Sequence, residues 1–241
     1  MTTNEQPIVV LVHGAFAESA SWNRVIRRLH GHGLQAVAVA NPLRSVAGDA
    51  AYVRDVINGI GRPVVLVGHS YGGMVITQAA AGLPAVQSLV YVAGFTPDTG
   101  ESALQLSGKF EGSTLGGALA AYPLASGGNE FRIADEKFHA QFCADLDAEE
   151  AALMAATQRP VTEQALTDGL EVSEPAWRTT PSWFVLGDRD LNIPAELIRF
   201  TAGRASSRGT REIAGASHAI AASQPEAVTA SILDAAADRQ G

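Results

Sequence analysis

The chain has 241 residues and a formal net charge of −8, with 17 Lys and Arg residues against 25 Asp and Glu residues. This length suits one domain with an insertion better than two independent domains. Its single cysteine excludes an internal disulfide and a cysteine-based metal cluster. The sequence has no basic stripe, which argues against nucleic acid as a partner.

The N-terminal residues 1–7 carry no positive charge ahead of an apolar run, unlike a signal peptide. The apolar runs of the chain have the length of strands and are too short to span a bilayer. We therefore expect a cytoplasmic protein without a membrane partner.

Residues 8–12 are a continuous run of branched apolar residues between Pro7 and Gly14, typical of a strand buried on both faces. Helical and extended patterns then alternate. Helices are predicted over 21–33, 49–60 and 71–82, and strands over 34–40, 63–68 and 86–93. This alternation indicates an α/β fold with a parallel sheet and right-handed crossovers.

The regular pattern stops at about residue 97 and returns at about residue 181. Between these points no strand of the earlier kind is expected, and helices are predicted over 135–146 and 147–158. The later core elements are strands over 182–186 and 210–213 and helices over 194–205 and 224–237. We therefore expect a six-stranded core from residues 1–96 and 181–241, with residues 97–180 as a helical cap insertion.

One segment carries a chemical motif. Gly68-His69-Ser70-Tyr71-Gly72 is a Gly-x-Ser-x-Gly sequence placed between a predicted buried strand and a predicted helix. In that setting the serine lies on a sharp turn with its hydroxyl above the sheet, and the flanking glycines avoid clashes. Ser70 is therefore the candidate nucleophile.

A serine hydroxyl needs a general base, and the base needs an orienting carboxylate. His218 lies in the loop after the last predicted strand, where this chain order places the base. The acid should follow the fifth strand, where Asp190 is favoured over Asp188. Asp98, after the fourth strand, is a weaker alternative.

An oxyanion hole requires two backbone N–H donors. The first is expected from Tyr71, directly after the nucleophile. The second is assigned to Ala15 in the loop after the first strand, where Gly14 permits a close bend, and Phe16 is the less favoured substitute.

The substrate pocket is expected to be mainly apolar. Five aromatic residues are its candidate contacts, although most apolar residues of the insertion should instead form the core of the cap. These candidates are Phe16, Phe110, Phe138, Phe142 and Trp177.

These motifs resemble the α/β-hydrolase superfamily, and within it the plant methylesterase and hydroxynitrile lyase family with its bacterial esterase relatives. The similarity extends over nearly the whole chain. It rests on segments 11–15, 21–22, 67–74, 95–98, 190–194 and 215–218. The resemblance implies a six-stranded parallel sheet, a helical cap and no cofactor.

Two positions depart from the lyases of that family, which carry a threonine after the first-loop histidine and a lysine after the histidine of the triad. Here these positions are Gly14 and Ala219, and without the cation the esterase pattern fits better. We expect hydrolysis of a small or medium hydrophobic carboxylic ester, with no metal.

Alternatives on the same scaffold are perhydrolysis in the metal-free haloperoxidase manner, lactone or amide hydrolysis, and carbon–carbon bond cleavage. A non-catalytic small-molecule receptor is a further alternative. The protein could also assemble as a homodimer, which the sequence alone does not test.

Overall fold

The computed structural model describes residues 6–238, so most of the N-terminal segment discussed above lies outside the described residues. Its main sheet has six strands in the order β2-β1-β3-β4-β8-β9. The bounds are β1 (Ile8–Val12), β2 (Ala36–Val39), β3 (Val64–His69), β4 (Val86–Val92), β8 (Ser182–Gly187) and β9 (Gly209–Ile213). Every neighbouring pair is parallel, as the sequence predicted.

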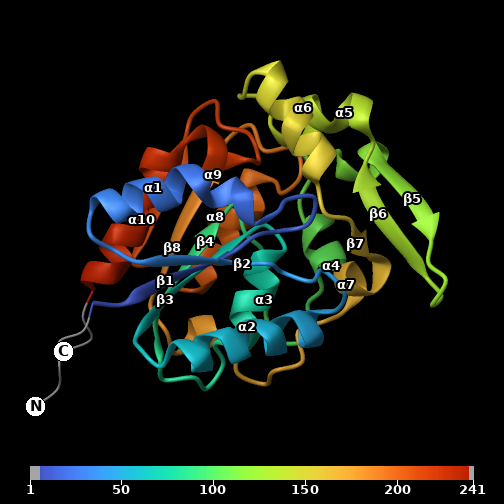
Figure 1. Ribbon diagram of the computed structural model, residues 1–241. Coiled ribbons are helices and arrows are strands. Elements are labelled where there is room, and N and C mark those ends of the chain that lie inside the picture. Colours follow the sequence, from blue (N-terminus) through green and yellow to red (C-terminus); the bar gives the residue numbers. More distant parts are fainter. Residues whose placement is uncertain (1–5, 239–241) are drawn as a thin grey trace, which may run out of the picture.

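Helices cover both faces of this sheet (Figure 1), with α1 and α10 together on one face and α2 and α3 on the other. The core helices are α1 (Asn23–Gly31), α2 (Val46–Ile60), α3 (Gly72–Ala79), α8 (Ala195–Arg204), α9 (Ile220–Ser223) and α10 (Pro225–Ala237). A short 3-10 helix, η1 (Ser19–Trp22), precedes α1.

The insertion contains both helices and strands. Its helices are α4 (Ala103–Ser107), α5 (Asp135–Phe142), α6 (Ala148–Thr157) and α7 (Glu163–Thr167), with 3-10 turns η2 (Leu115–Ala118) and η3 (Ala176–Arg178). Its antiparallel sheet consists of β5 (Leu119–Pro123), β6 (Asn129–Ile133) and β7 (Val161–Thr162).

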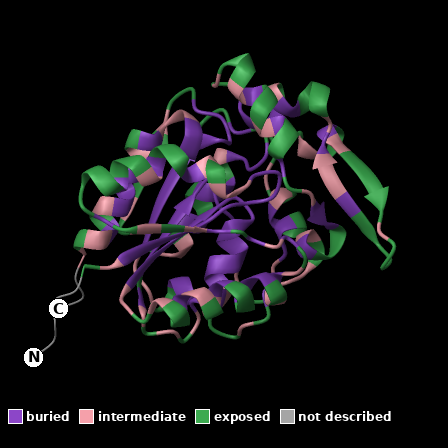
Figure 2. Cartoon of the chain, in the orientation of Figure 1, coloured by how far each residue is buried: buried purple, intermediate pink, exposed green. Residues whose placement is uncertain are grey.

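The helices of the insertion were expected, whereas its small antiparallel sheet was not predicted from the sequence. The β5–β6 hairpin projects from the molecule, with β5 largely exposed and β6 only partly buried (Figures 1 and 2). Exposed strands lack the continuous apolar run by which the core strands were recognised.

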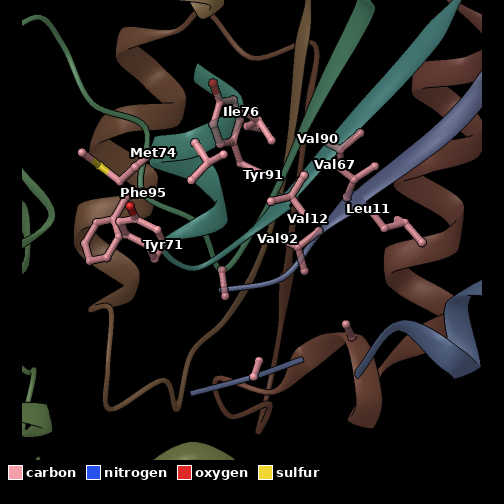
Figure 3. Close-up of a cluster of buried hydrophobic side chains, with 14 of the residues drawn as sticks. Leu11, Val12, Val67, Tyr71, Met74, Ile76, Val90, Tyr91, Val92 and Phe95 are labelled. Atoms are coloured by element: carbon pink, nitrogen blue, oxygen red, sulfur yellow. The ribbon is translucent and has the colours of Figure 1, made fainter. Parts of the chain in front are cut away.

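The core of the molecule lies on the main sheet. Figure 3 shows side chains of β1, β3 and β4 packed together with Tyr71 and Met74, all of them buried. Because these strands are parallel, the carboxyl ends of β1, β3, β8 and β9 lie along one edge of the sheet, which is where ligands bind in open parallel sheets. Within residues 6–238, no helix combines the length and apolar character that a membrane span requires.

Candidate active site

Ser70 lies on the turn between β3 and α3. Its backbone φ is 54°, a left-handed conformation that is strained for a residue with a side chain. The turn is held because the Ser70 carbonyl accepts the N–H groups of Gly73 at 2.9 Å and Phe95 at 3.1 Å. This geometry is that of a nucleophile turn in which the serine hydroxyl stands above the end of the strand.

The glycines of the motif allow neighbouring backbone segments to approach this turn. A Cβ atom at Gly68 would lie 2.6 Å from the Gly72 carbonyl oxygen, and one at Gly72 would lie 2.5 Å from the Val12 carbonyl oxygen. Both distances are shorter than a Cβ contact allows. The spacing of glycines around Ser70 therefore has a steric cause.

His218 connects Ser70 to a carboxylate. Its Nε2 lies 2.9 Å from Ser70 Oγ, and its Nδ1 lies 2.7 Å from Asp190 Oδ2. Because a carboxylate can only accept at that position, Nδ1–H donates and Nε2 is left to accept the serine hydroxyl proton. The structure thus brings the three predicted residues together, and the side chains of His218 and Asp190 are almost completely buried.

Asp190 is also held by its own loop. Its Oδ1 accepts the backbone N–H groups of Asn192 at 2.8 Å and Ile193 at 3.0 Å, which leaves Oδ2 to the histidine. The two alternative acids have other partners. Asp188 accepts the Gly215 N–H at 2.6 Å, and Asp98 pairs with the Arg178 guanidinium, which holds the Asp98 pKa below its usual value.

The predicted oxyanion donors lie on either side of Ser70. A Cβ atom at Gly14 would be 3.2 Å from Ser70 Oγ, so the loop that carries Ala15 lies against the hydroxyl. Among the described residues, neither the Ala15 N–H nor the Tyr71 N–H donates to a backbone carbonyl. The Phe16 N–H, in contrast, donates to the Arg159 carbonyl of the insertion at 3.0 Å.

Two further histidines support these loops from inside the core. His69 donates from Nε2 to the His218 carbonyl at 3.0 Å, and burial lowers the pKa of His69 to about 3. His13 accepts the Asn41 N–H at Nε2 and donates from Nδ1 to the Gly14 carbonyl, and burial lowers its pKa to about 4. Both rings are therefore neutral near pH 7 and orient the backbone around the site.

The phenol of Tyr71 is anchored below the turn. Its hydroxyl donates to Asp49 Oδ2 at 3.0 Å, and desolvation raises the pKa of this fully buried carboxyl group. Sequence reasoning did not single out Asp49. The available signal was its place on α2, where it shares the buried helix face with Val46, Val53 and Ile57.

The predicted aromatic contacts fall into two groups. Phe142 packs edge-on against the His218 ring, with the ring centroids 5.1 Å apart. The Phe138 ring packs in turn against Phe142, with a centroid distance of 5.0 Å. Phe110 instead packs on Phe200 of α8, with the ring centroids 5.7 Å apart. Their roles toward a substrate stay predictions.

The remaining two aromatic candidates also have defined surroundings. Trp177 donates from Nε1 to the Pro97 carbonyl at 2.7 Å, at the base of the insertion. Phe16 lines a cavity of about 380 Å³ between the start of α1 and helix α6, together with Met154 and Ala222. Its lining also includes four charged side chains, those of Glu18, Arg24, Arg27 and Glu150.

Within residues 6–238, no group of three or more His, Cys, Asp or Glu side chains is placed to hold a metal ion. The chemistry that the observed groups can perform is nucleophilic attack by Ser70 with proton transfer through His218.

The model of the Alpha/beta hydrolase family matches residues 9–231. The chain is 28% identical to the Alpha/beta hydrolase nvfD of Aspergillus novofumigatus, over 97% of this chain and 98% of that protein. It is 26% identical to Esterase PIR7B of Oryza sativa subsp. japonica, over 90% of each chain. The crystal structure of polyneuridine aldehyde esterase superposes with a TM-score of 0.81 at 21% identity, over 95% of this chain and 99% of that one, which shows a shared fold.

Proposed function

Because the chain belongs to the alpha/beta hydrolase family, we propose that it hydrolyses a carboxylic ester through an acyl-enzyme on Ser70. The observation that carries the proposal is the continuous hydrogen-bonded path from Asp190 through His218 to Ser70, at 2.7 and 2.9 Å. The similarity to an esterase over 90% of the chain supports the same reaction class.

In the proposed mechanism, His218 Nε2 takes the hydroxyl proton while Ser70 Oγ attacks the ester carbonyl. Asp190 holds the imidazole in the required tautomer and stabilises the imidazolium. His218 then returns the proton to the departing alcohol. A water molecule that His218 deprotonates hydrolyses the acyl-enzyme by the same steps.

The oxyanion of each tetrahedral intermediate is assigned to the N–H groups of Ala15 and Tyr71. The absence of a backbone acceptor for these two groups within the described residues supports this assignment. The hydrogen bond from the Phe16 N–H to the Arg159 carbonyl supports Ala15 over Phe16 as the second donor.

We assign a small or medium hydrophobic ester as the substrate class. The aromatic side chain of Phe142, which packs edge-on against His218, supports an apolar substrate over a charged one.

Hydroxynitrile cleavage is disfavoured by Gly14. A Cβ atom there would lie 2.5 Å from Ser70 Cβ, so the threonine of the lyases could not be accommodated without moving the serine. Ala219 offers no cation beside His218 to stabilise a departing cyanide.

The test is labelling with a fluorophosphonate probe and mapping of the modified residue, combined with turnover of p-nitrophenyl esters of increasing acyl length. Ser70→Ala should abolish both labelling and turnover, and His218→Ala should suppress them strongly. Ser107→Ala, at a half-buried serine of the insertion whose hydroxyl donates to the Leu104 carbonyl, is the matched control and should retain both. Unchanged turnover in Ser70→Ala would refute the proposal, and tight ligand binding without turnover would favour a receptor.

A further inference from the structure

Helix α5 of the insertion ends against the histidine loop. The carbonyl of its last residue, Phe142, accepts the Ala219 N–H at 2.9 Å, and the Phe142 ring packs on His218. Ser217 donates to Asp145, just beyond the same helix end. The residues on both sides of His218 are thus bonded to the insertion.

The preceding residue of α5, Gln141, is bonded to the loop of the acid. Its buried side chain donates from Nε2 to the Leu191 carbonyl and to Asn192 Oδ1, each at 2.9 Å. Its Oε1 accepts the Thr114 hydroxyl at 2.9 Å, and its carbonyl accepts Asn192 Nδ2 at 3.3 Å. Since a carbonyl can only accept, the contact with Leu191 fixes the orientation of the amide.

Leu191 and Asn192 form the turn directly after Asp190. The Asn192 N–H is one of the two donors to Asp190 Oδ1, at 2.8 Å, so a shift of this residue would move the carboxylate away from His218. The Leu191 carbonyl also accepts the Thr114 N–H at 2.9 Å. The acid loop is therefore held in place from the insertion at two consecutive residues.

We propose that Gln141 is a positioning residue for the reaction: through Leu191 and Asn192 it sets the position of the Asp190 carboxylate against His218. The inference rests on the proposed function. It also makes α5 a part of the active-site framework, with Gln141 fixing the acid loop and Phe142 fixing the histidine loop.

The chain offers a matched control for this proposal. Gln158 is a second buried glutamine of the insertion, and its side chain makes three hydrogen bonds, to Ile133 N, Ile133 O and Ala155 O, but none to the acid loop. Gln141→Met and Gln158→Met remove the same chemical groups at a similar cost in stability. Only Gln141→Met should lose catalytic rate.

The measurement is kcat and KM for a p-nitrophenyl ester, with thermal unfolding of each variant. Gln141→Met should lower kcat by about 10- to 100-fold, with KM within about twofold, because misplaced catalytic groups slow the chemical step. Gln158→Met should change kcat by less than about twofold. If Gln141→Met does not fold, Thr114→Val removes the hydroxyl that donates to Gln141 Oε1 and should lower kcat by about two- to tenfold.

A double-mutant cycle separates positioning from general destabilisation. When Asp190→Asn is already present, adding Gln141→Met should lower kcat by less than about twofold further, because both changes affect the same interaction. Equal kcat in the two methionine variants, or a full additional loss on the Asp190→Asn background, would overturn the positioning role. Activity that persists in Ser70→Ala would instead refute the proposed function itself.

Discussion

Gly14 occupies the space directly above the serine. Its loop follows β1, and the hydrogen bonds of His13 to Asn41 and to the Gly14 carbonyl hold it there. An ideal Cβ atom at position 14 would lie 2.5 Å from Ser70 Cβ and 2.7 Å from the His69 carbonyl oxygen. Neither neighbour can move without displacing the nucleophile.

Gly14→Ala should therefore impair the chemistry more than the fold. We expect kcat/KM for a p-nitrophenyl ester to fall by about 100-fold or more, since displacements of about 1 Å at reacting groups have effects of this size. Gly116→Ala is the control, because a Cβ atom there meets nothing within 4 Å. Equal activity of the two variants would show that the loop can accommodate a Cβ atom at position 14 without displacing Ser70.

The two buried histidines predict how stability depends on pH. The pKa values of His13 and His69 in the folded chain are about 4 and about 3, below the value of 6.5 for an exposed histidine. Below pH 6.5 the unfolded chain binds protons that the folded chain does not, so stability is complete above pH 6.5 and is lost as the pH falls. Between pH 6.5 and its pKa in the folded chain, each histidine lowers the free energy of unfolding by about 1.4 kcal/mol per pH unit of acidification.

Urea unfolding of His69→Asn between pH 7 and pH 4 isolates one of these contributions. The variant should lose less stability per pH unit than the parent, by about 1.4 kcal/mol. Parallel curves for the parent and His69→Asn would contradict the assignment of a neutral, buried His69.

The residues predicted from the sequence and those missed differ in how their partners are encoded. Ser70, His218 and Asp190 were found because each follows a recognisable strand in a fixed chain order. Gln141 meets its partners Leu191 and Asn192 about 50 positions later, across the boundary between insertion and core. No local pattern marks such a contact.

At the scale of elements, the same contrast separates the core from the insertion. The inner strands of the main sheet are buried on both faces, so the sequence shows them as apolar runs such as β1 and β3. Strand β5 is largely exposed and β6 is only partly buried, and they contain alanine, proline and charged residues. Only the glycine pair Gly127 and Gly128, both with positive φ, marked their hairpin turn.

The hydrogen bond between Tyr71 and Asp49 joins α2 to the nucleophile turn. Tyr71→Phe would leave the buried Asp49 Oδ2 without this donor, and we expect the free energy of unfolding to fall by about 1–3 kcal/mol. Tyr52→Phe is the control. Tyr52 lies on α2, the helix of Asp49, and because it is 40% exposed it should tolerate the change. Urea unfolding measures the free energy of unfolding of both variants. An equal loss in the two would mean that the hydrogen bond between Tyr71 and Asp49 does not stabilise the fold.

In the molecule as a whole, the insertion is fastened to the core at several separate places. Arg24 of α1 donates to Glu150 of α6 at 2.5 Å. Gln141 and Phe142 reach the acid and histidine loops, as described above. Near the base of the insertion, Arg204 of α8 bonds Glu101. These contacts favour an insertion that unfolds together with the core.

Arg204 provides the sharpest test of this coupling. Its guanidinium donates to both carboxylate oxygens of Glu101, at 3.0 and 2.8 Å, and to the Thr96 carbonyl at 2.6 Å, while its side chain is only 18% exposed. Arg204→Met should lower the free energy of unfolding by about 2 kcal/mol in a single cooperative transition, because it leaves a half-buried carboxylate without its partner.

Arg199 on the same helix is the matched control. It also pairs with a glutamate through two nitrogen atoms, but its side chain is 51% exposed, so solvent weakens the pair. Arg199→Met should therefore change stability little. Similar losses in the two variants would mean that burial does not decide the strength of these pairs, whereas two separate unfolding transitions in Arg204→Met would mean that the insertion folds independently of the sheet beneath it.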